Sequence, residues 1–502
     1  MARTRSASLA AVVLAGGLGT RFRTSTPKVL QPLCGRPLLW HALQLALAAE
    51  PDRLVVVLPP GASAVADAVR SFALDPVPTF VTQREPLGTG HAVRAATRAI
   101  GTVDDVLVVG GDFDPVREDD VRALLRLHRR TGSAASILTT EATEPKAYAR
   151  IVRDGDRLLD IVEGSDAPKE LLAIREVSTL VMAFRRADLA AALPKIRRNN
   201  RQREYYLNAV FPFFLAAGER VSALRADTGG LLGPNSQADL AAVAALVRRR
   251  INRAHMDRGV LLVDPEQTYI DVGVAIGADT TVLPLTFLEG GTRVGRGCRI
   301  GPGTRLVDTV VGDGSAVEFS VALGARLGRD VRVGPYTRLR PGAVLEDGSF
   351  AGGFVEVKNA TIGEGSKVPH LAYVGDADIG RGVNLGAGTV TVNYDGRAKH
   401  RTRIGDGAFI GSDTMLVAPI EVGAGAMTGA GSVVTRDVPP GALAIERSEQ
   451  RTIEGYAERR TKARGKAAKS AGTTAKGTTA ATETPKKSAK RPAKPADPKG
   501  RR

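Results

Sequence analysis

The first residues that could do chemistry form a glycine-rich loop close to the N-terminus. An apolar run over residues 9–15 leads directly into this loop, which contains Gly16, Gly17 and Gly19. A loop of this kind after a buried strand presents backbone N–H groups to phosphates. Arg21 and Lys28 follow and add positive charge. The loop is neither a Walker A motif nor a dinucleotide-binding G-x-G-x-x-G, but with both cations it predicts a phosphate site.

Two further polar groups follow apolar stretches downstream. Gln83 precedes the turn Gly88-Thr89, which places a side-chain amide suited to reading a nucleotide base beside an open turn. Asp112 follows the apolar stretch Val106–Val109, and a carboxylate at a strand end is well placed to hold Mg²⁺ between nucleotide phosphates. A helix N-cap is the alternative interpretation of Asp112.

A second polar group lies in the C-terminal half, among the cationic residues Arg340, Lys358 and Lys399. His370, Tyr373 and Asn384 occur between these cations in the sequence. A histidine in these surroundings suits a general base that faces an anionic substrate. A lone histidine would more often be structural. Metal binding is not expected here, because no second histidine or acid stands at ligand spacing.

The residues of the first group need a scaffold of alternating strands and helices. The sequence predicts a helix over 37–49 and strands at Leu54–Leu58, 77–82 and Val106–Val109. This order indicates a doubly wound, Rossmann-like α/β domain, in which ligands bind at the carboxyl ends of the strands. A long helix over 237–256 is then predicted to connect this domain to the C-terminal half.

The second group stands on a ladder of aliphatic residues spaced six apart. One clean run is Val282, Leu288, Val294, Ile300 and Leu306, and after a slip the ladder continues as Val311, Val317, Leu323 and then Leu327, Val333, Leu339, Leu345. Neither a helical nor a simple strand period explains this step. Hexads of this kind are typical of a parallel β-helix. Residues 392–403 leave the register, as an inserted functional loop would.

Composition limits the remaining possibilities. A chain of 502 residues should form more than one domain, and no apolar run is long enough to span a membrane. The two cysteines, Cys34 and Cys298, cannot build a disulfide framework, which favours a reducing compartment. Between Arg459 and Arg502 there are 15 Lys and Arg residues but only two acids, so this tail should be disordered. Weak polyanion binding by the tail and a solvated extension without a partner both remain open.

The glycine-rich loop and Asp112 resemble the sugar-1-phosphate nucleotidyltransferases. With the hexads included, residues 8–457 are similar to the bifunctional bacterial N-acetylglucosamine-1-phosphate uridylyltransferase/glucosamine-1-phosphate N-acetyltransferases. The resemblance implies a uridylyltransferase domain (1–236), a connector helix (237–262), a left-handed β-helix acetyltransferase domain (263–457) and a tail (458–502). It also implies a cytoplasmic homotrimer that makes UDP-N-acetylglucosamine for cell-envelope synthesis, with no membrane contact.

The same resemblance implies roles for individual residues. In the N-terminal site, UTP would be bound by Leu14, Gly16, Gly17, Gly19, Arg21, Lys28, Gln83, Gly88 and Thr89, Mg²⁺ by Asp112 and Asn235, and N-acetylglucosamine-1-phosphate by Ala149, Glu163 and Ser178. In the C-terminal site, His370 would be the base, glucosamine-1-phosphate would be bound by Arg340, Lys358, Tyr373, Asn384 and Lys399, and acetyl-CoA by Ala387, Asn393, Tyr394, Ser412, Ala430 and Arg447.

The sequence departs from the family pattern mainly on the sugar side of the first site. The family's Gly-Tyr-Gly-Arg reads Ala147-Tyr148-Ala149-Arg150, and its Asn-Ser/Thr-Gly reads Ser178-Thr179-Leu180. The usual proline two residues after the metal-binding aspartate is Asp114. Because the metal and phosphate residues are mostly kept, we expect UTP and Mg²⁺ binding to be retained, whereas the changed residues should weaken or alter sugar binding. The alternative to a fully bifunctional enzyme is therefore an acetyltransferase whose uridylyltransferase domain is impaired or has an altered sugar specificity.

Overall fold

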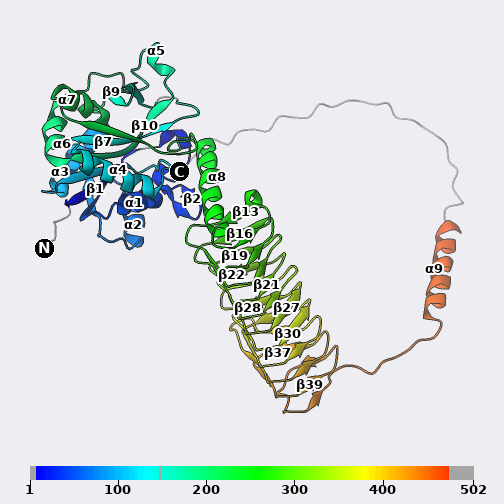
Figure 1. Ribbon diagram of the computed structural model, residues 1–502. Helices are drawn as coiled ribbons and strands as arrows, with labels where there is room; N and C mark the ends of the chain where they lie inside the picture. Colours follow the sequence, from blue (N-terminus) through cyan, green and yellow to red (C-terminus); the bar gives the residue numbers. More distant parts are fainter. Residues whose placement is uncertain (1–6, 18, 146–147, 474–502) are drawn as a thin grey trace, which may run out of the picture. The chain divides into compact units, whose positions relative to one another are not determined.

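The computed structural model describes residues 7–17, 19–145 and 148–473 (Figure 1). The chain divides into a large unit that ends at Glu446 and a small unit that begins at Arg447. Within the described residues, no helix combines the length and the apolar character that crossing a membrane requires. Cys34 and Cys298 are both free thiols, as the sequence predicts.

The N-terminal domain is built on a nine-stranded sheet with the order β11-β7-β10-β6-β1-β4-β5, to which β8 and β9 are attached. Its central strands β6, β1, β4 and β5 are parallel, whereas β10 runs antiparallel between β6 and β7. The strands of the domain are β1 (Leu9–Leu14), β2 (Pro32–Leu33), β3 (Arg36–Pro37), β4 (Arg53–Leu58), β5 (Thr79–Thr82), β6 (Asp105–Gly110), β7 (Ala135–Glu141), β8 (Arg150–Asp154), β9 (Arg157–Val162), β10 (Glu176–Arg185) and β11 (Val221–Arg225).

Helices cover both faces of this sheet, which explains why the central strand β1 is apolar and buried along its whole length. Along β1, Ala11 and Val13 pack into one core while Ala10 and Val12 pack into the other, because successive side chains of a strand point to opposite faces. The helices of the domain are α1 (Leu38–Leu47), α2 (Ser63–Ser71), α3 (Thr89–Ile100), α4 (Glu118–Thr131), α5 (Lys169–Leu172), α6 (Arg186–Ala192) and α7 (Phe211–Ala216). The predicted doubly wound fold is confirmed.

The connector is the helix α8 (Gln237–Met256), at the position that the sequence predicts. It begins at the N-cap Ser236, whose side chain accepts a hydrogen bond from the backbone of Asp239. Its first turns pack Leu240 and Val243 into the N-terminal core, while Met256 packs against the core of the β-helix. A single helix is therefore anchored in both domains.

The C-terminal domain is a left-handed parallel β-helix made of three sheets (Figure 1). The first sheet contains β12 (Leu261–Leu262), β15 (Thr281–Val282), β18 (Arg299–Ile300), β21 (Ala316–Val317), β24 (Arg332–Val333), β27 (Phe350–Gly353), β30 (Lys367–His370), β33 (Asn384–Leu385), β36 (Phe409–Ile410), β39 (Met427–Thr428) and β41 (Leu443–Ala444).

The second sheet contains β13 (Thr268–Ile270), β16 (Thr286–Glu289), β19 (Arg305–Val307), β22 (Val321–Leu323), β25 (Arg338–Leu339), β28 (Glu356–Lys358), β31 (Tyr373–Gly375), β34 (Val390–Val392), β37 (Met415–Val417) and β40 (Val433–Val434). The third contains β14 (Ala275–Ile276), β17 (Arg293–Val294), β20 (Val310–Val311), β23 (Arg326–Leu327), β26 (Val344–Leu345), β29 (Thr361–Ile362), β32 (Ala377–Ile379), β35 (Thr402–Ile404) and β38 (Ile420–Val422).

The six-residue step arises because each coil passes through all three sheets. Val282 pairs with Ile300 in the next coil, and both side chains are buried in the core. Buried Ser and Thr hydroxyls satisfy backbone carbonyls at the corners; Thr292, for example, donates to the carbonyl of Glu289 at 2.7 Å. The aliphatic residues thus fill a narrow core, and the hydroxyls prevent unsatisfied polar groups where the chain turns.

One position of the predicted ladder is wrong. In β22 the buried residue is Ala322, at 1% exposure, whereas Leu323 is only half-buried. The step from Val317 to Ala322 is five residues, so the inward position comes one residue earlier than a regular hexad requires. The prediction chose Leu323 over Ala322 because leucine is the larger aliphatic residue and fits the six-residue step.

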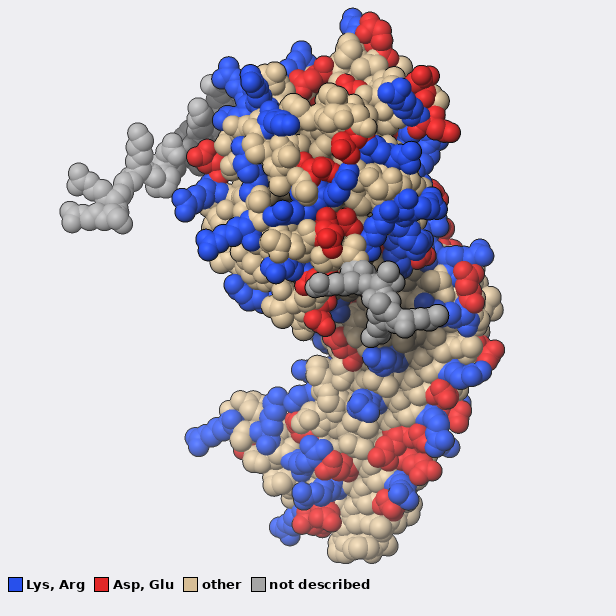
Figure 2. All heavy atoms as spheres, turned by 60° about the vertical axis from the view of Figure 1, so that its left-hand side comes forward, with Lys and Arg blue, Asp and Glu red and all other residues tan. Residues whose placement is uncertain are grey.

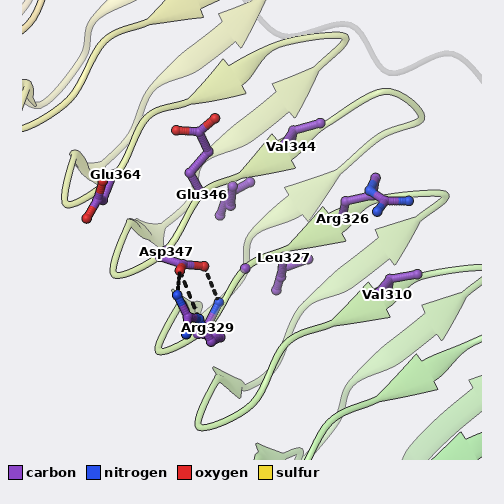
Figure 3. A pocket seen from close by; sticks show the side chains of 10 residues that line it. Val310, Arg326, Leu327, Arg329, Val344, Glu346, Asp347 and Glu364 are labelled. Carbon is purple, nitrogen blue, oxygen red and sulfur yellow. Dashed lines mark hydrogen bonds and ion pairs between the residues drawn. The ribbon is translucent and has the colours of Figure 1, made fainter.

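Ion pairs connect neighbouring coils on the outside of the β-helix. Acidic and basic side chains are interspersed on the face that Figure 2 shows. In the shallow hollow of Figure 3, about 470 Å³ in volume, Arg329 donates from Nε and Nη2 to Oδ2 of Asp347 at 2.9 and 2.7 Å. Arg326 and Glu346 also line this hollow. Because Arg329 and Asp347 are occupied by each other, we regard the hollow as part of the coil-to-coil packing.

The first part of the tail that the sequence predicts to be disordered from residue 458 contains one helix. The small unit contains the helix α9 (Tyr456–Thr473), which is rich in alanine, lysine and arginine. These residues have high helix propensity, so a segment that cannot form a core can still form a helix. The remainder of the predicted tail, residues 474–502, lies outside the described residues.

Candidate active sites

A cavity of about 580 Å³ opens at the carboxyl ends of the central strands of the N-terminal domain. Val29, Pro86, Leu180 and Glu204 contribute to its walls. The cavity is also lined by all the predicted UTP-binding residues and by both predicted metal ligands, namely Leu14, Gly16, Gly17, Gly19, Arg21, Lys28, Gln83, Gly88, Thr89, Asp112 and Asn235. The topology therefore brings together residues that are far apart in the sequence.

Two glycines are required by the close packing of the cavity wall. Gly19 has a φ of 60°, and a Cβ atom there would collide with the side chain of Lys28. Gly88 has a φ of 100°, and a Cβ atom there would lie 2.7 Å from the carbonyl oxygen of Tyr205. Both loops can therefore approach their neighbours closely, which leaves their backbone groups at the cavity.

Gln83 is held in one orientation at the cavity wall. The side chain is 4% exposed, and its Nε2 donates to the carbonyl of Gly88 at 3.1 Å and lies 3.1 Å from Nδ1 of His91. Its Oε1 lies so close to Gly16 that a Cβ atom there would come within 2.9 Å. The hydroxyl of the neighbouring Thr89 accepts the backbone N–H of Leu207 at 2.9 Å, so this side chain also has a structural role.

Lys28 joins the two predicted metal ligands. Its Nζ lies 2.6 Å from Oδ2 of Asp112 and 3.0 Å from Oδ1 of Asn235. Arg21 donates to the same oxygen of Asn235 at 2.9 Å. The position of the Lys28 ammonium group thus shows that Oδ2 of Asp112 and Oδ1 of Asn235 can both contact a single cation.

The donor set at this point fits magnesium. A carboxylate and an amide are the hard oxygen ligands that Mg²⁺ prefers, and this ion usually takes only one or two carboxylates together with phosphates and water. Among the described residues, no group of three or more His, Cys, Asp or Glu side chains could hold a metal by itself. Asp112 and Asn235 would therefore need the phosphates of a bound nucleotide to complete a magnesium site.

The predicted sugar side looks different from the nucleotide side. Ala149, Glu163 and Ser178 are not among the residues that line the cavity. Ser178 donates its backbone N–H to the carbonyl of Ala149 at 2.9 Å, and its hydroxyl donates to the carbonyl of Thr179. Glu163 accepts the side chain of Asn208 at 2.8 Å, and burial, together with the charges of nearby acids, raises the pKa of Glu163.

Leu180 is one of the cavity residues that sequence reasoning did not assign to the site. It lines the wall beside Asp112, and its side chain covers Gly110, where a Cβ atom would lie 3.1 Å from Cδ2 of Leu180. The departure from the family's Asn-Ser/Thr-Gly pattern was the available signal, but only the fold shows that the new side chain enters the cavity.

The second candidate site lies on successive coils of the β-helix. His370 is exposed at the end of β30, where it stands opposite Gly353 of β27. Lys358 ends β28, Tyr373 begins β31 and pairs with Glu356 of β28, and Asn384 of β33 pairs with Lys367 of β30. The coils therefore bring these predicted residues into adjacent rows.

Asp376 organises the cations of this site and was also missed from the sequence. Its carboxylate accepts hydrogen bonds from the ammonium group of Lys358 at 3.0 Å and from the side-chain amide of Asn359 at 2.7 Å. It also accepts a hydrogen bond from the side-chain amide of Asn393. Burial alone would raise the pKa of Asp376, but these three hydrogen bonds outweigh burial and lower it. The carboxylate is therefore charged and holds Lys358 and Asn393 in place.

The predicted insertion is confirmed as a loop between β34 and β35. Tyr394 and Lys399 form an isolated antiparallel bridge, and the backbone of His400 donates to the carbonyl of Asn393 at 2.8 Å. Lys358 contacts Lys399 and, by its hydrogen bond and its charge, lowers the pKa of Lys399. Arg340 contributes a further charge near Lys399 and is bound by Glu356 at 2.9 Å.

The residues predicted to bind acetyl-CoA fall partly on one corner of the β-helix. The backbone N–H of Asp413 donates to the carbonyl of Ala387, and the N–H of Gly431 donates to the carbonyl of Ser412 at 2.8 Å. Ala387, Ser412 and Ala430 thus belong to equivalent turns of consecutive coils. Arg447 belongs to the small unit, so its contact with this group stays a prediction.

The fold and the two sites define a class of protein in which a nucleotidyltransferase domain precedes a hexapeptide acyltransferase domain. The family model of the MobA-like NTP transferase domain matches residues 11–207, and that of the bacterial transferase hexapeptide (six repeats) matches residues 401–436.

Curated relatives match the chain over nearly its whole length. "Bifunctional protein GlmU" of Desulfitobacterium hafniense (strain DSM 10664 / DCB-2) is 43% identical over 454 residues, which cover 90% of this chain and 99% of the relative. The protein of the same name from Streptomyces avermitilis is 44% identical, and the match covers 90% of this chain and 94% of that relative. The one from Mycobacterium sp. (strain KMS) is 46% identical, and the match covers 91% of this chain and 93% of that relative. The chain belongs to the bifunctional GlmU family.

Proposed function

We propose that this enzyme catalyses two consecutive steps of UDP-N-acetylglucosamine synthesis. The β-helix domain transfers the acetyl group of acetyl-CoA to glucosamine-1-phosphate, and the N-terminal domain then transfers a uridylyl group from UTP to the product. The observation that carries this proposal is the 580 Å³ cavity, which collects every predicted nucleotide-binding residue around the pair Lys28 and Asp112. Because UTP and acetyl-CoA are cytoplasmic metabolites, we place the enzyme in the cytoplasm.

In the acetyl transfer, the cations of the β-helix bind the sugar phosphate. Arg340, Lys358 and Lys399 neutralise the phosphate charge, while Tyr373 and Asn384 hold the sugar by hydrogen bonds. His370 takes a proton from the attacking amine, whose nitrogen forms a bond to the thioester carbonyl carbon. The bond from that carbon to sulfur then breaks, and coenzyme A leaves as the thiol after it takes up a proton.

In the uridylyl transfer, residues of the cavity position the α-phosphate of UTP and the phosphate of the sugar for an in-line reaction. Gln83 and the turn at Gly88 hold the uracil, and the Gly16–Gly19 loop with Arg21 and Lys28 holds the triphosphate. A phosphate oxygen of the sugar forms a bond to the α-phosphorus, and pyrophosphate leaves. Mg²⁺, held by Asp112 and Asn235, supplies charge neutralisation when it is bound. Positioning and electrostatic stabilisation provide most of the catalysis.

The sugar specificity of the first site is the part that differs from the family pattern. We propose that Ala149, Glu163 and Ser178 surround the N-acetylglucosamine-1-phosphate subsite. A methyl group at 149 and a short hydroxyl at 178 offer fewer contacts than glycine backbone and an asparagine amide. The alternative is an acetyltransferase whose uridylyl transfer is impaired or directed to another sugar phosphate.

We further propose that the enzyme is a homotrimer in which one acetyltransferase site receives His370 and Lys399 from different chains. Exposed rings contact one another along one edge of the β-helix: the ring of Tyr336 is tilted against Phe319, with 5.9 Å between centroids, and stacked on Phe354, with 5.3 Å between centroids. Leu371, next to His370, is 62% exposed. An exposed apolar row of this kind favours burial against another copy. A Tyr336→Glu variant that remained trimeric by light scattering and fully active would contradict this role.

The test of the two activities uses parallel assays on one preparation. Pyrophosphate release is measured from UTP and N-acetylglucosamine-1-phosphate with Mg²⁺, and coenzyme A release from acetyl-CoA and glucosamine-1-phosphate. His370→Ala should lower only coenzyme A release, by roughly 10²- to 10⁴-fold, and Asp112→Ala should lower only pyrophosphate release. Absence of pyrophosphate release from the wild type, with acetyl transfer intact, would support the alternative function.

A further inference from the structure

Asp114 is a buried carboxylate next to the nucleotide cavity that has no part in the mechanism above. It is 7% exposed, and each of its oxygens accepts one backbone N–H group. Oδ2 accepts a hydrogen bond from the backbone N–H of Leu180, and Oδ1 accepts one from the backbone N–H of Gly233, both at 2.8 Å. The side chain therefore turns away from solvent and toward two backbone segments from other parts of the chain.

Both donors belong to segments that border the cavity. Leu180 lies where the register between β10 and β7 shifts, between Ser178 and Met182. Gly233 lies two residues before Asn235, in the segment that leads into α8. Asp114 follows β6 and so joins the wall of the cavity and the Asn235 segment to the strand end that carries Asp112.

Hydrogen bonds extend this connection from Gly233 to the amide of Asn235. The hydroxyl of Tyr148 donates to the carbonyl of Gly233 at 2.8 Å and accepts Nδ2 of Asn235 at 2.9 Å. Because the nitrogen side of the amide is used in this way, Oδ1 faces Lys28 and Arg21. A displaced Gly233 would free the amide to rotate and would present a nitrogen to a cation.

The surroundings of Asp114 disfavour the charged form of its carboxyl group. Burial and the charge of Asp112 raise the pKa of Asp114 to about 6. A proline stands at this place in the pattern of the family that the sequence resembles, and proline offers no acceptor to Gly233 or Leu180. In this chain the aspartate supplies one acceptor to each of these two backbone N–H groups.

We propose that Asp114 is a positioning residue for uridylyl transfer, which holds Gly233 and thereby keeps Oδ1 of Asn235 beside Oδ2 of Asp112 as a pair of cation ligands. The inference rests on the proposed function of the N-terminal site and adds a determinant of its cation affinity. Asp114 itself contacts neither the cation nor the nucleotide, since both of its oxygens are occupied by backbone donors.

The experiment compares Mn²⁺ binding to the full-length protein saturated with UTP, in the absence of a sugar phosphate, by electron paramagnetic resonance titration. Asp114→Asn keeps the shape but turns an amide nitrogen toward one of the two backbone donors. We expect its Mn²⁺ affinity to fall about 10- to 100-fold, as for other residues that orient metal ligands. Pyrophosphate release should recover as the Mg²⁺ concentration is raised, and acetyl transfer should be unchanged.

Two further variants separate positioning from general stability. Asp264→Asn is the matched control, because Asp264 also accepts backbone N–H groups, from Glu266 and Gln267, but lies at the start of the β-helix. Its Mn²⁺ affinity should equal that of the wild type even if its thermal midpoint falls. Tyr148→Phe removes one hydroxyl from the other end of the connection and should weaken Mn²⁺ binding in the same way, should Asp114→Asn fail to fold.

Wild-type Mn²⁺ affinity in Asp114→Asn, or in Tyr148→Phe where only that variant folds, would overturn the proposal. The proposed function fails separately, if the wild type releases no pyrophosphate. The comparison of Mn²⁺ affinities still decides the role of Asp114 in that case, because it does not depend on turnover.

Discussion

The ammonium group of Lys28 lies 2.6 Å from Oδ2 of Asp112 in an ion pair whose lysine side chain is only 8% exposed. The two residues come from separate segments, a short helical turn after the glycine-rich loop and the end of β6. Because the same ammonium also reaches Asn235, Lys28 occupies the point where a cation and a phosphate would have to meet. This relationship makes Lys28 the most informative residue of the N-terminal site.

Lys28→Ala should reduce pyrophosphate release by roughly 10²- to 10³-fold, because it removes a preorganised charge from the developing negative charge of the leaving pyrophosphate. Coenzyme A release should be unchanged. The exposed Lys169, in α5, provides the matched control, and Lys169→Ala should leave both activities at the wild-type level. Equal activity of both variants would contradict the proposed role of Lys28.

Asp376→Asn should affect the other activity. The carboxylate holds Lys358 and Asn393, so the amide variant loses the charge that orients these two groups. A small displacement of positioning residues can cost roughly 10²-fold in rate, and we expect this loss in coenzyme A release. Steady-state kinetics with varied glucosamine-1-phosphate are the measurement. Unaltered kinetics would show that Lys358 and Asn393 are held by other contacts.

The stability of the N-terminal domain should depend on pH through Asp105. Burial alone would raise the pKa of Asp105, but hydrogen bonds from His128 and Arg129 outweigh burial and lower it below 3.8. A lowered folded-state pKa stabilises the protein above the unfolded value and loses this contribution as the pH falls through the folded value. Asp105→Asn should therefore lower the thermal midpoint at pH 7. The difference from the wild type should shrink below pH 3.8, and a constant difference would contradict the assignment.

The register of the β-helix core can be tested with two leucines of the hexad ladder. Leu339→Ala removes a fully buried side chain and should cost about 2–5 kcal/mol in the free energy of unfolding. Leu323→Ala should cost much less, because Leu323 is half-buried beside the inward-pointing Ala322. Chemical denaturation of both variants, followed by circular dichroism, measures the difference. Equal costs would favour the regular hexad.

The helix α9 should give the protein a weak, salt-dependent affinity for polyanions. Its described side chains are exposed and include Arg459, Arg460, Lys462 and Arg464. Binding of such residues to phosphates releases counterions, so affinity should fall steeply as salt rises. Fluorescence anisotropy with a labelled duplex DNA, with and without residues 456–502, is the measurement. Binding that survives truncation would place the polyanion site elsewhere.

The architecture was predictable because it is repeated in the sequence, whereas single contacts were not. Hexads reveal a β-helix through their period, and the glycine-rich loop with Lys28 reveals a nucleotide site through residue types. Ala322 was missed because a five-residue step between two consecutive strands of one coil leaves no trace in residue type. Asp376 and Asp114 were missed as functional groups because their importance lies in which backbone and side-chain donors surround them, and those donors come from distant segments.

The helix α8 protects the first coil of the β-helix. Asn252 donates from Nδ2 to the carbonyls of Pro265 at 2.7 Å and Thr268 at 3.0 Å, and Ile251 packs against the cores of both domains. An uncovered end of a solenoid is a strand edge on which other chains can assemble. An acetyltransferase fragment that starts at β12 would expose that edge and should aggregate. A fragment that starts at Ser236 would keep α8 over this coil and should stay soluble, so the helix that joins the two catalytic halves also closes the open end of the second.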